Sequence, residues 1–322
     1  MHNPILLGAA ALLAASTVVA QDSAEIPRNR FDTDILAETF GYDTATPASV
    51  EIESLYQGCP TRDCIPSIDD PSYESVQRAD EWLADGALVM AVEIDGQARA
   101  FPVRILDRHE IVNDTIAGRA VAITWCPLCG SGVAFDRNVG GDVLEFGVSG
   151  LLHGSDLVMY DRTSESLWQQ ITGEAIVGPR LGVELDRLPL AFSEWHEWRS
   201  RNPDGKVLAR PSRWGIDYGR RPYGDYDESA RLMFPAENRD FSVHPKTVVY
   251  GFDIDGDKLA VLEESLPDDA PVETRLGDRS LTIERRDDGT VVATGNGGGE
   301  AWTATRLFWF AWYNFNPDTA RL

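Results

Sequence analysis

Apolar and polar residues alternate in short runs through most of the chain, which is the pattern of β-strands with one buried face. The clearest pair lies at Leu88–Glu93 and Ala98–Val103, on either side of Asp95-Gly96. Asp-Gly between two apolar runs favours a tight hairpin turn. Further runs predict strands, and they are Ala120–Trp125, Gly132–Asp136, Val143–Val148 and Leu157–Tyr160. The pattern therefore predicts a protein built mainly from β-sheet.

Helical spacing is confined to a few segments. In Leu190–Arg201 the aromatic residues Phe192, Trp195 and Trp198 recur every third position, which indicates one helix in the middle of the chain. Two shorter helices are predicted at Phe31–Phe40 and Tyr73–Ala84. With the strands, these segments predict an α+β fold that is mostly β.

A weak internal repeat divides the sheet-rich part of the chain. Leu88–Gly96 resembles Val248–Gly256, and in both places a second strand follows the Asp-Gly pair. Similar glycine-initiated runs then begin at Gly118 and at Gly277. Two unrelated hairpins are the alternative, because Asp-Gly hairpins are common. We expect two related sheet-rich halves, of which only the first contains thiols near the repeat.

The predicted organisation of the chain has five segments. They are a signal peptide at 1–20, an irregular segment with short helices at 21–86, a first sheet-rich half carrying the Cys-x-x-Cys motif at 87–190, a helical and loop connection at 191–245, and a second sheet-rich half acting as scaffold at 246–322.

The first 20 residues have the pattern of an export signal. The apolar run Ile5–Ala15 is too short to span a bilayer comfortably, and Val18-Val19-Ala20 fits a small-residue cleavage site. An uncleaved N-terminal anchor is the alternative. We expect a periplasmic or secreted protein whose mature chain has no membrane span.

The strongly acidic composition narrows the classes of partner. A formal net charge of −23 argues against nucleic acid and against anionic membrane surfaces. No Walker motif, dinucleotide fingerprint, G-x-S-x-G or H-E-x-x-H occurs in the sequence. The sequence leaves open whether the protein is an enzyme and identifies no partner, although an exported redox or metal-delivery protein is a candidate.

The four cysteines form two close pairs with different surroundings. Cys59 and Cys64 lie in a proline-rich loop, and in an exported chain this spacing predicts a local disulfide. Cys126 and Cys129 lie in Cys-Pro-Leu-Cys-Gly at the end of a predicted strand. Thiols kept free outside the cytoplasm usually serve metal binding or redox chemistry.

Three interpretations of Cys126 and Cys129 are open. A thioredoxin-type thiol–disulfide oxidoreductase needs the first thiolate at a helix N-terminus, but Gly130 and Gly132 make a poor helix start. A strand that ends in Cys-Pro-x-Cys-Gly instead favours a metal-binding turn. The third interpretation is a non-catalytic binding module in which this pair is a structural disulfide. A single Cys-x-x-Cys needs further ligands to hold a metal.

Histidines and one methionine are the candidate partners of the two thiols. His109 lies in a compact polar segment, Arg108–Asp114, and is the first candidate. His153, in a glycine-flanked loop, and Met159 are further candidate ligands. Two thiolates and one imidazole suit copper or zinc, and a thioether contact favours copper over zinc. The expected function is redox chemistry or metal handling outside the cytoplasm.

Several segments together resemble a known family. They are Gly58–Pro71, His109–Asp114, Cys126–Ser131, Phe146–Gly150, Leu157–Arg162, Ser166–Gln169 and Phe308–Asp318. The chain resembles the exported bacterial and archaeal family catalogued as domain of unknown function 3179, which brings no established activity.

The resemblance implies which candidate residues are common to the family. His109, Cys126 and Cys129 match family motifs, whereas the family usually has glycine at the positions of Cys59 and Cys64. His153 falls at a variable position, which lowers it as a ligand. The resemblance also implies a common cleft, or alternatively packing and ion-pair roles, for four residues: Asp161, Arg162, Trp168 and Gln169.

Overall fold

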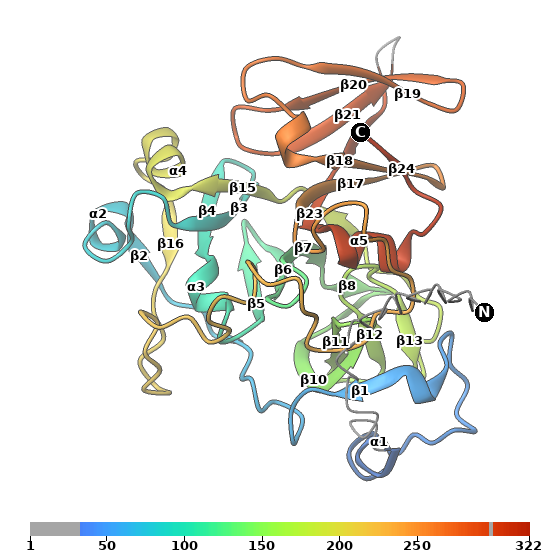
Figure 1. The fold of residues 1–322 in the computed structure, drawn as a ribbon. Coiled ribbons are helices and arrows are strands. Elements are labelled where there is room, and N and C mark those ends of the chain that lie inside the picture. The colour runs from blue at the N-terminus through green and yellow to red at the C-terminus, as the bar shows by residue number, and fades with distance from the viewer. Residues whose placement is uncertain (1–32, 296–298) are drawn as a thin grey trace, which may run out of the picture.

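The computed structural model describes residues 33–295 and 299–322, so the predicted signal peptide lies outside the described residues. No helix within these ranges is both long and apolar enough to cross a membrane. The protein is a mostly β, α+β structure whose sheets are joined by short helices (Figure 1).

The first half contains the predicted Asp-Gly hairpin, formed by β3 (Leu88–Ile94) and β4 (Gln97–Pro102). Asp95 and Gly96 both have positive φ, 49° and 74°, as a type I′ turn requires. The outer strands of this sheet are β15 (Ala191–Glu194), antiparallel to β3, and β16 (Lys206–Leu208), parallel to β4; β2 (Tyr73–Ser75) adds to its edge. The chain passes from β15 to β16 through α4 (Trp195–Arg201).

A second sheet completes the first half. Its strands are β5 (Ile111–Ile116), β6 (Arg119–Cys126), β7 (Ser131–Asp136) and β14 (Arg187–Leu188), in the order β14-β7-β6-β5. The short helix α3 (Val103–Leu106) links β4 to this sheet. Because β15 and β16 belong to the first half, that half extends to Leu208, past residue 190.

The second half repeats this topology sheet by sheet. One sheet has the order β23-β17-β18-β24, with β23 antiparallel to β17 and β24 parallel to β18, and α5 (Trp309–Phe315) between β23 and β24. The other has the order β19-β20-β21-β22. The strand bounds are β17 Val248–Ile254, β18 Asp257–Leu262, β19 Val272–Leu276, β20 Arg279–Arg285, β21 Val291–Gly295, β22 Ala301–Thr303, β23 Thr305–Phe308 and β24 Ala320–Arg321. The predicted pair of related halves is confirmed.

The ends of α4 and α5 repeat as well. Asn202 ends α4 by donating from its backbone N and its Nδ2 to the carbonyl of Trp198. Asn316 ends α5 in the same way on the carbonyl of Trp312. In both places proline follows the asparagine, because proline cannot continue the helix.

The first half differs from the second by an insertion between β7 and β14. It contains β8 (Asn138–Val139), β9 (Asp142–Val143), β10 (Phe146–His153), β11 (Asp156–Asp161), β12 (Leu167–Gln169) and β13 (Ala175–Val177). Strands β10 to β13 form a sheet whose edge is completed by β1 (Leu55–Gln57). Figure 1 shows this insertion sheet at the opposite end of the molecule from the second half.

Three predicted elements differ in extent from the observed ones. The predicted helix Leu190–Arg201 is helical only from Trp195, because the preceding residues pair with β3. The predicted helix Tyr73–Ala84 is reduced to α2 (Val76–Ala79), since its first residues form β2 against β16. The strand predicted at Val143–Val148 starts at Phe146. The remaining predicted helix is observed as α1 (Thr33–Phe40).

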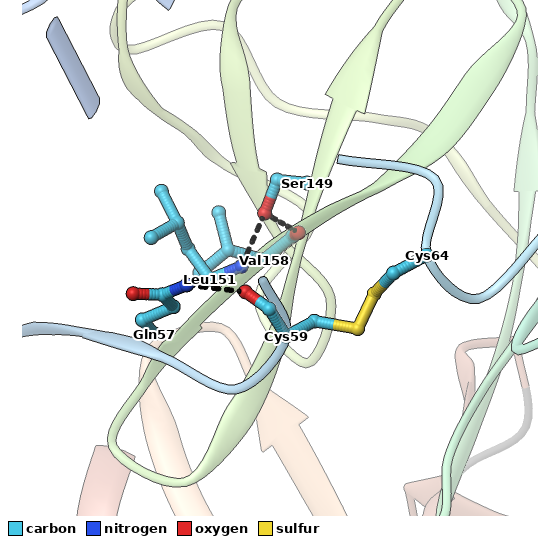
Figure 2. The surroundings of a disulfide bond; sticks show 6 residues. All are labelled: Gln57, Cys59, Cys64, Ser149, Leu151 and Val158. Atoms are coloured by element: carbon cyan, nitrogen blue, oxygen red, sulfur yellow. Dashed lines mark hydrogen bonds between the residues drawn. A yellow bond between two sulfur atoms is a disulfide. The ribbon is translucent and has the colours of Figure 1, made fainter. Parts of the chain in front are cut away.

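The predicted disulfide between Cys59 and Cys64 is present, with the two Cα atoms 6.3 Å apart (Figure 2). Its loop docks on a β-bulge of β10, where Gly58 N and Cys59 N both donate to the carbonyl of Gly150. Figure 2 shows Gln57 beside this loop, where its Nε2 donates to the carbonyl of Cys59 at 2.8 Å. The disulfide closes the loop, and these backbone bonds attach the loop to the insertion sheet.

Residues 209–247, here called the connecting segment, join the two halves without forming a helix or strand. Its aromatic side chains Tyr226 and Phe234 are buried in the same hydrophobic cluster as Cys126 and Cys129. Long connections without secondary structure are uncommon in compact domains and often serve binding or gating. This segment covers the region where the first half, the insertion and the second half meet.

Candidate metal site

The two free thiols lie in the hairpin loop between β6 and β7. Cys126 pairs with Ser131 at the end of the ladder, and Cys129 N donates to the carbonyl of Cys126 at 3.1 Å to close the turn. Gly130 follows with φ 57°, and a Cβ there would lie 2.8 Å from the ring of Phe308. Phe308 N also donates to the carbonyl of Cys129. The second half therefore holds this hairpin loop in place.

A carboxylate from the insertion joins the thiols. The ligand atoms of Cys126, Cys129 and Asp156 all lie within 4.8 Å of one another, and all three side chains are buried. Asp156 begins β11, directly after Ser155, whose carbonyl accepts from the Cys129 thiol at 3.3 Å. Ser155 is held in the left-handed region, at φ 68°, and its Oγ donates to the carbonyl of Phe234.

Asp156 is oriented by two donors and leaves one oxygen free. Its Oδ2 accepts from Gln169 Nε2 at 2.6 Å and from Ile171 N at 2.9 Å. Its Oδ1 is buried and has no hydrogen-bond partner. His153 Nδ1 in turn donates to Gln169 Oε1 at 2.7 Å, because the amide oxygen only accepts. The free oxygen is the kind of unsatisfied buried group that calls for a ligand.

Acidic groups without a cationic partner dominate the electrostatics of the site. Burial raises the pKa of the Cys126 thiol and raises that of the Cys129 thiol well above its ordinary value. Burial, with the nearby Asp156 and Asp107 carboxylates adding to it, raises the pKa of Glu110 to about 8. The pKa of Asp156 rises to about 6, because burial outweighs the bonds from Ile171 and Gln169. A bound cation would offset these penalties.

Two tyrosines of the connecting segment lie against the thiols. Burial is the main cause that raises the pKa of Tyr223 and Tyr226, and the neighbouring Cys126 contributes in both cases. Lys246 Nζ lies 3.9 Å from the ring centroid of Tyr226 and donates to the carbonyls of Ser229 and Arg231. The connecting segment thus closes the thiol cluster on one side.

The structure does not bring His109 to the thiols. Its Nδ1 donates to the carbonyl of Pro66 at 2.7 Å, and its Nε2 lies 2.6 Å from the hydroxyl of Tyr218. Burial lowers the pKa of His109, so the ring is neutral and Nε2 accepts from Tyr218. Both ring nitrogens are therefore occupied, and the carboxylate of Asp156 takes the place in which we expected an imidazole.

The other two candidate ligands are not among the three clustered residues. Met159 is fully buried and pairs with Val148 and Trp168. It belongs to the same hydrophobic cluster as Cys126 and Cys129, so a thioether contact stays a prediction. His153 does not join the cluster itself, but it bonds Gln169, which in turn bonds Asp156.

The four predicted cleft residues have separate roles. Asp161 accepts from the indole of Trp168 at 3.0 Å, and both side chains are buried. Arg162 forms ion pairs with three carboxylates, including Asp63 in the disulfide loop. Only Gln169 contributes to the thiol cluster, through Asp156. Three of these four residues therefore make packing contacts, hydrogen bonds or ion pairs outside the thiol cluster.

Sequence reasoning missed Asp156 and Glu110. Asp156 precedes the apolar run Leu157–Tyr160, and an ionisable residue at the buried end of such a strand was the available signal. Glu110 lies beside His109 in the polar segment that was singled out, and it has positive φ, 57°. The residue pattern does not reveal this positive φ.

The chain matches the family described as Protein of unknown function (DUF3179) over residues 62–319. Since this match covers most of the chain, the protein belongs to that family. The matched range includes the hairpin loop with both free thiols and the whole insertion. No curated protein and no solved structure matches the chain.

Proposed function

We propose that this protein binds one thiophilic metal ion through Cys126, Cys129 and Asp156. The observation that carries the proposal is the free Oδ1 of Asp156, buried beside two free thiols with their ligand atoms within 4.8 Å. Three protein ligands leave one coordination position for a further ligand, as in zinc sites that carry out chemistry. The proposed role is metal handling or metal-dependent chemistry in an exported protein.

The donor set favours zinc over copper. Copper was favoured by an imidazole from His109 and a thioether from Met159, and the cluster contains a carboxylate in place of the imidazole. Two thiolates and a carboxylate are ligands that zinc accepts, at about 2.3 Å for sulfur and about 2.0–2.2 Å for carboxylate oxygen. A carboxylate is a hard donor and does not favour Cu(I).

The pKa directions argue against the alternative of a metal-free thiol–disulfide oxidoreductase. An attacking cysteine in such enzymes has a lowered pKa, which a helix N-terminus or a nearby cation provides. Here the turn follows a strand, and burial raises the pKa of both thiols. A metal would stabilise the thiolates directly, because metal binding displaces the thiol protons.

The test is the metal content of protein purified from its native compartment, together with a count of free thiols. We expect about one zinc per chain. Cys126→Ser and Asp156→Asn should each lower zinc affinity by at least about tenfold. The matched control is the double variant Cys59→Ser/Cys64→Ser, which removes the other two sulfurs and should keep full stoichiometry. Replacing zinc with Co²⁺ should give a thiolate charge-transfer band that is lost in Cys126→Ser.

Two outcomes would reject the proposal. One is unchanged metal stoichiometry and affinity in the Cys126 and Asp156 variants. The other is a metal-free protein that forms a mixed disulfide at Cys126 with a small thiol, which would favour the oxidoreductase instead.

A further inference from the structure

A second cavity lies beside the hairpin loop, outside the metal cluster. It has a volume of about 590 Å³, within the range of small-molecule sites. Trp125 and Pro127, which flank Cys126, form one wall. Tyr223 and Tyr226 form another, so the tyrosines that lie against the thiols also line this cavity.

The cavity has an excess of cationic side chains in a chain of net charge −23. We call this cavity the cationic cleft. Its described lining includes four cationic residues, Arg104, Arg221, Lys246 and Arg306, and two acidic residues, Asp107 and Asp227. Arg221 is paired with Asp227 at 2.5 Å. Asp107 accepts from the indole of Trp125 at 2.9 Å.

Three of the four cations lack a carboxylate partner among the described residues. Arg104 donates only to the carbonyl of Trp82, at 3.5 Å. Arg306 lies over the ring of Phe192, 5.1 Å from its centroid. Lys246 is buried, bonds two backbone carbonyls and lies over the ring of Tyr226. Unneutralised cations around a cavity favour an anionic ligand.

The second half supplies a natural comparison, because the repeat creates a counterpart cleft of about 950 Å³ at the equivalent place. The loop between β20 and β21 lines the counterpart cleft, as the thiol hairpin lines the cationic cleft. Its described lining has six acidic residues and four arginines, the reverse balance. Arg306 lines both clefts, so the difference in charge comes from Arg104, Arg221 and Lys246, which line the cationic cleft alone.

We propose that the cationic cleft binds a flat organic anion, an aromatic carboxylate, next to the thiol cluster. The guanidinium groups of Arg104 and Arg306 would pair with the carboxylate, and the aromatic walls at Trp125 and Tyr223 would pack against the ring. The proposal goes beyond the metal site and stands without it, because none of the three metal ligands lines the cleft.

The test uses three benzene derivatives of different charge: terephthalate, and the near-isosteric pair benzoate and benzamide. Binding is measured by calorimetry and by saturation-transfer NMR on metal-free full-length protein. Terephthalate should bind most tightly and benzamide at least about tenfold more weakly, and the difference should shrink as salt is added. Equal binding of the charged and neutral probes, or no saturable binding of terephthalate at millimolar concentration, would overturn the proposal.

Matched variants locate the binding. Arg104→Gln, which changes the cationic cleft alone, should weaken terephthalate binding at least about tenfold, and Arg306→Gln, which changes both clefts, must show the same loss. Arg286→Gln, which changes a residue of the counterpart cleft alone, should leave binding unchanged. Unchanged binding in both test variants, or an equal loss in Arg286→Gln, would refute the site. Zinc binding measured on Arg104→Gln should be unaffected, which separates this proposal from the metal site.

Discussion

The buried carboxyl of Glu110 makes the metal-free protein less stable as the pH rises. Its pKa is about 8 in the folded state, against an ordinary value of 4.5. The folded protein therefore holds this proton more tightly than the unfolded chain does. The resulting stabilisation is complete below pH 4.5 and is lost as the pH rises through the window from 4.5 to about 8.

Between pH 6.5 and 8 Glu110 is the acidic group with the largest change, and Lys246, whose pKa burial lowers to about 8, opposes it near the upper limit. Asp107 and Asp156, with pKa values raised to about 6, act in the same direction at lower pH. His109, whose pKa is lowered from 6.5, acts in the opposite direction and only below that value. At about 1.4 kcal/mol per pH unit, Glu110 should lower the free energy of unfolding by about 1–2 kcal/mol across the range.

Urea unfolding in the presence of a chelator, followed by tryptophan fluorescence at several pH values, measures this slope. Glu110→Gln keeps the shape and the left-handed backbone demand of the residue but removes the titration, so it should flatten the slope. Glu93→Gln, at an exposed position on β3, is the control and should keep the wild-type slope. An identical slope in Glu110→Gln and the wild type would refute the reasoning.

Three further predictions concern His109, Gly130 and the disulfide. His109→Ala should lower the free energy of unfolding by about 1–3 kcal/mol, because Pro66 and Tyr218 lose their buried partner. Zinc affinity should stay unchanged, and a large loss of zinc affinity in the folded variant would restore His109 as a ligand. Gly130→Ala should lower the free energy of unfolding by about 1–3 kcal/mol and weaken zinc binding, because the positive φ and the ring of Phe308 both oppose a Cβ at this position. An unfolding midpoint equal to that of the wild type would contradict this prediction. Cys59→Ser/Cys64→Ser should cost about 2 kcal/mol, as the short loop implies, and peptide mapping of unreduced protein should show Cys59 joined to Cys64.

The sequence predicted the elements whose signal is local. The Asp95-Gly96 hairpin, the strand into Cys126 and the short loop between Cys59 and Cys64 each depend on neighbouring residues, and all three are observed. Where a strand partner lies far away, prediction was poorer. Ala191–Glu194 looked helical because its aromatic spacing continues into α4, yet pairing with β3 makes it a strand.

The sequence predicted the two thiols of the candidate site but not its carboxylate. Both thiols of the cluster follow from their spacing and their strand. The carboxylate could not be found in this way, because Asp156 reaches the thiols through the packing of an insertion whose sheet has no counterpart in the second half. In the polar segment around His109, the Glu110 carboxyl lies near enough to contribute to the raised pKa of Cys126, whereas the imidazole bonds Pro66 and Tyr218.

The insertion has a consequence for the order in which the proposed site is assembled. Cys129 meets the carbonyl of Ser155 only when β10 and β11 have formed, and its own carbonyl is bonded only when Phe308, near the C-terminus, has arrived. Closing such long loops is slow compared with forming a hairpin. The complete site, with its ligands and the backbone bond that holds the thiol loop, therefore needs contacts from the insertion and from the second half. An incompletely folded second half would leave the thiol loop without the bond from Phe308.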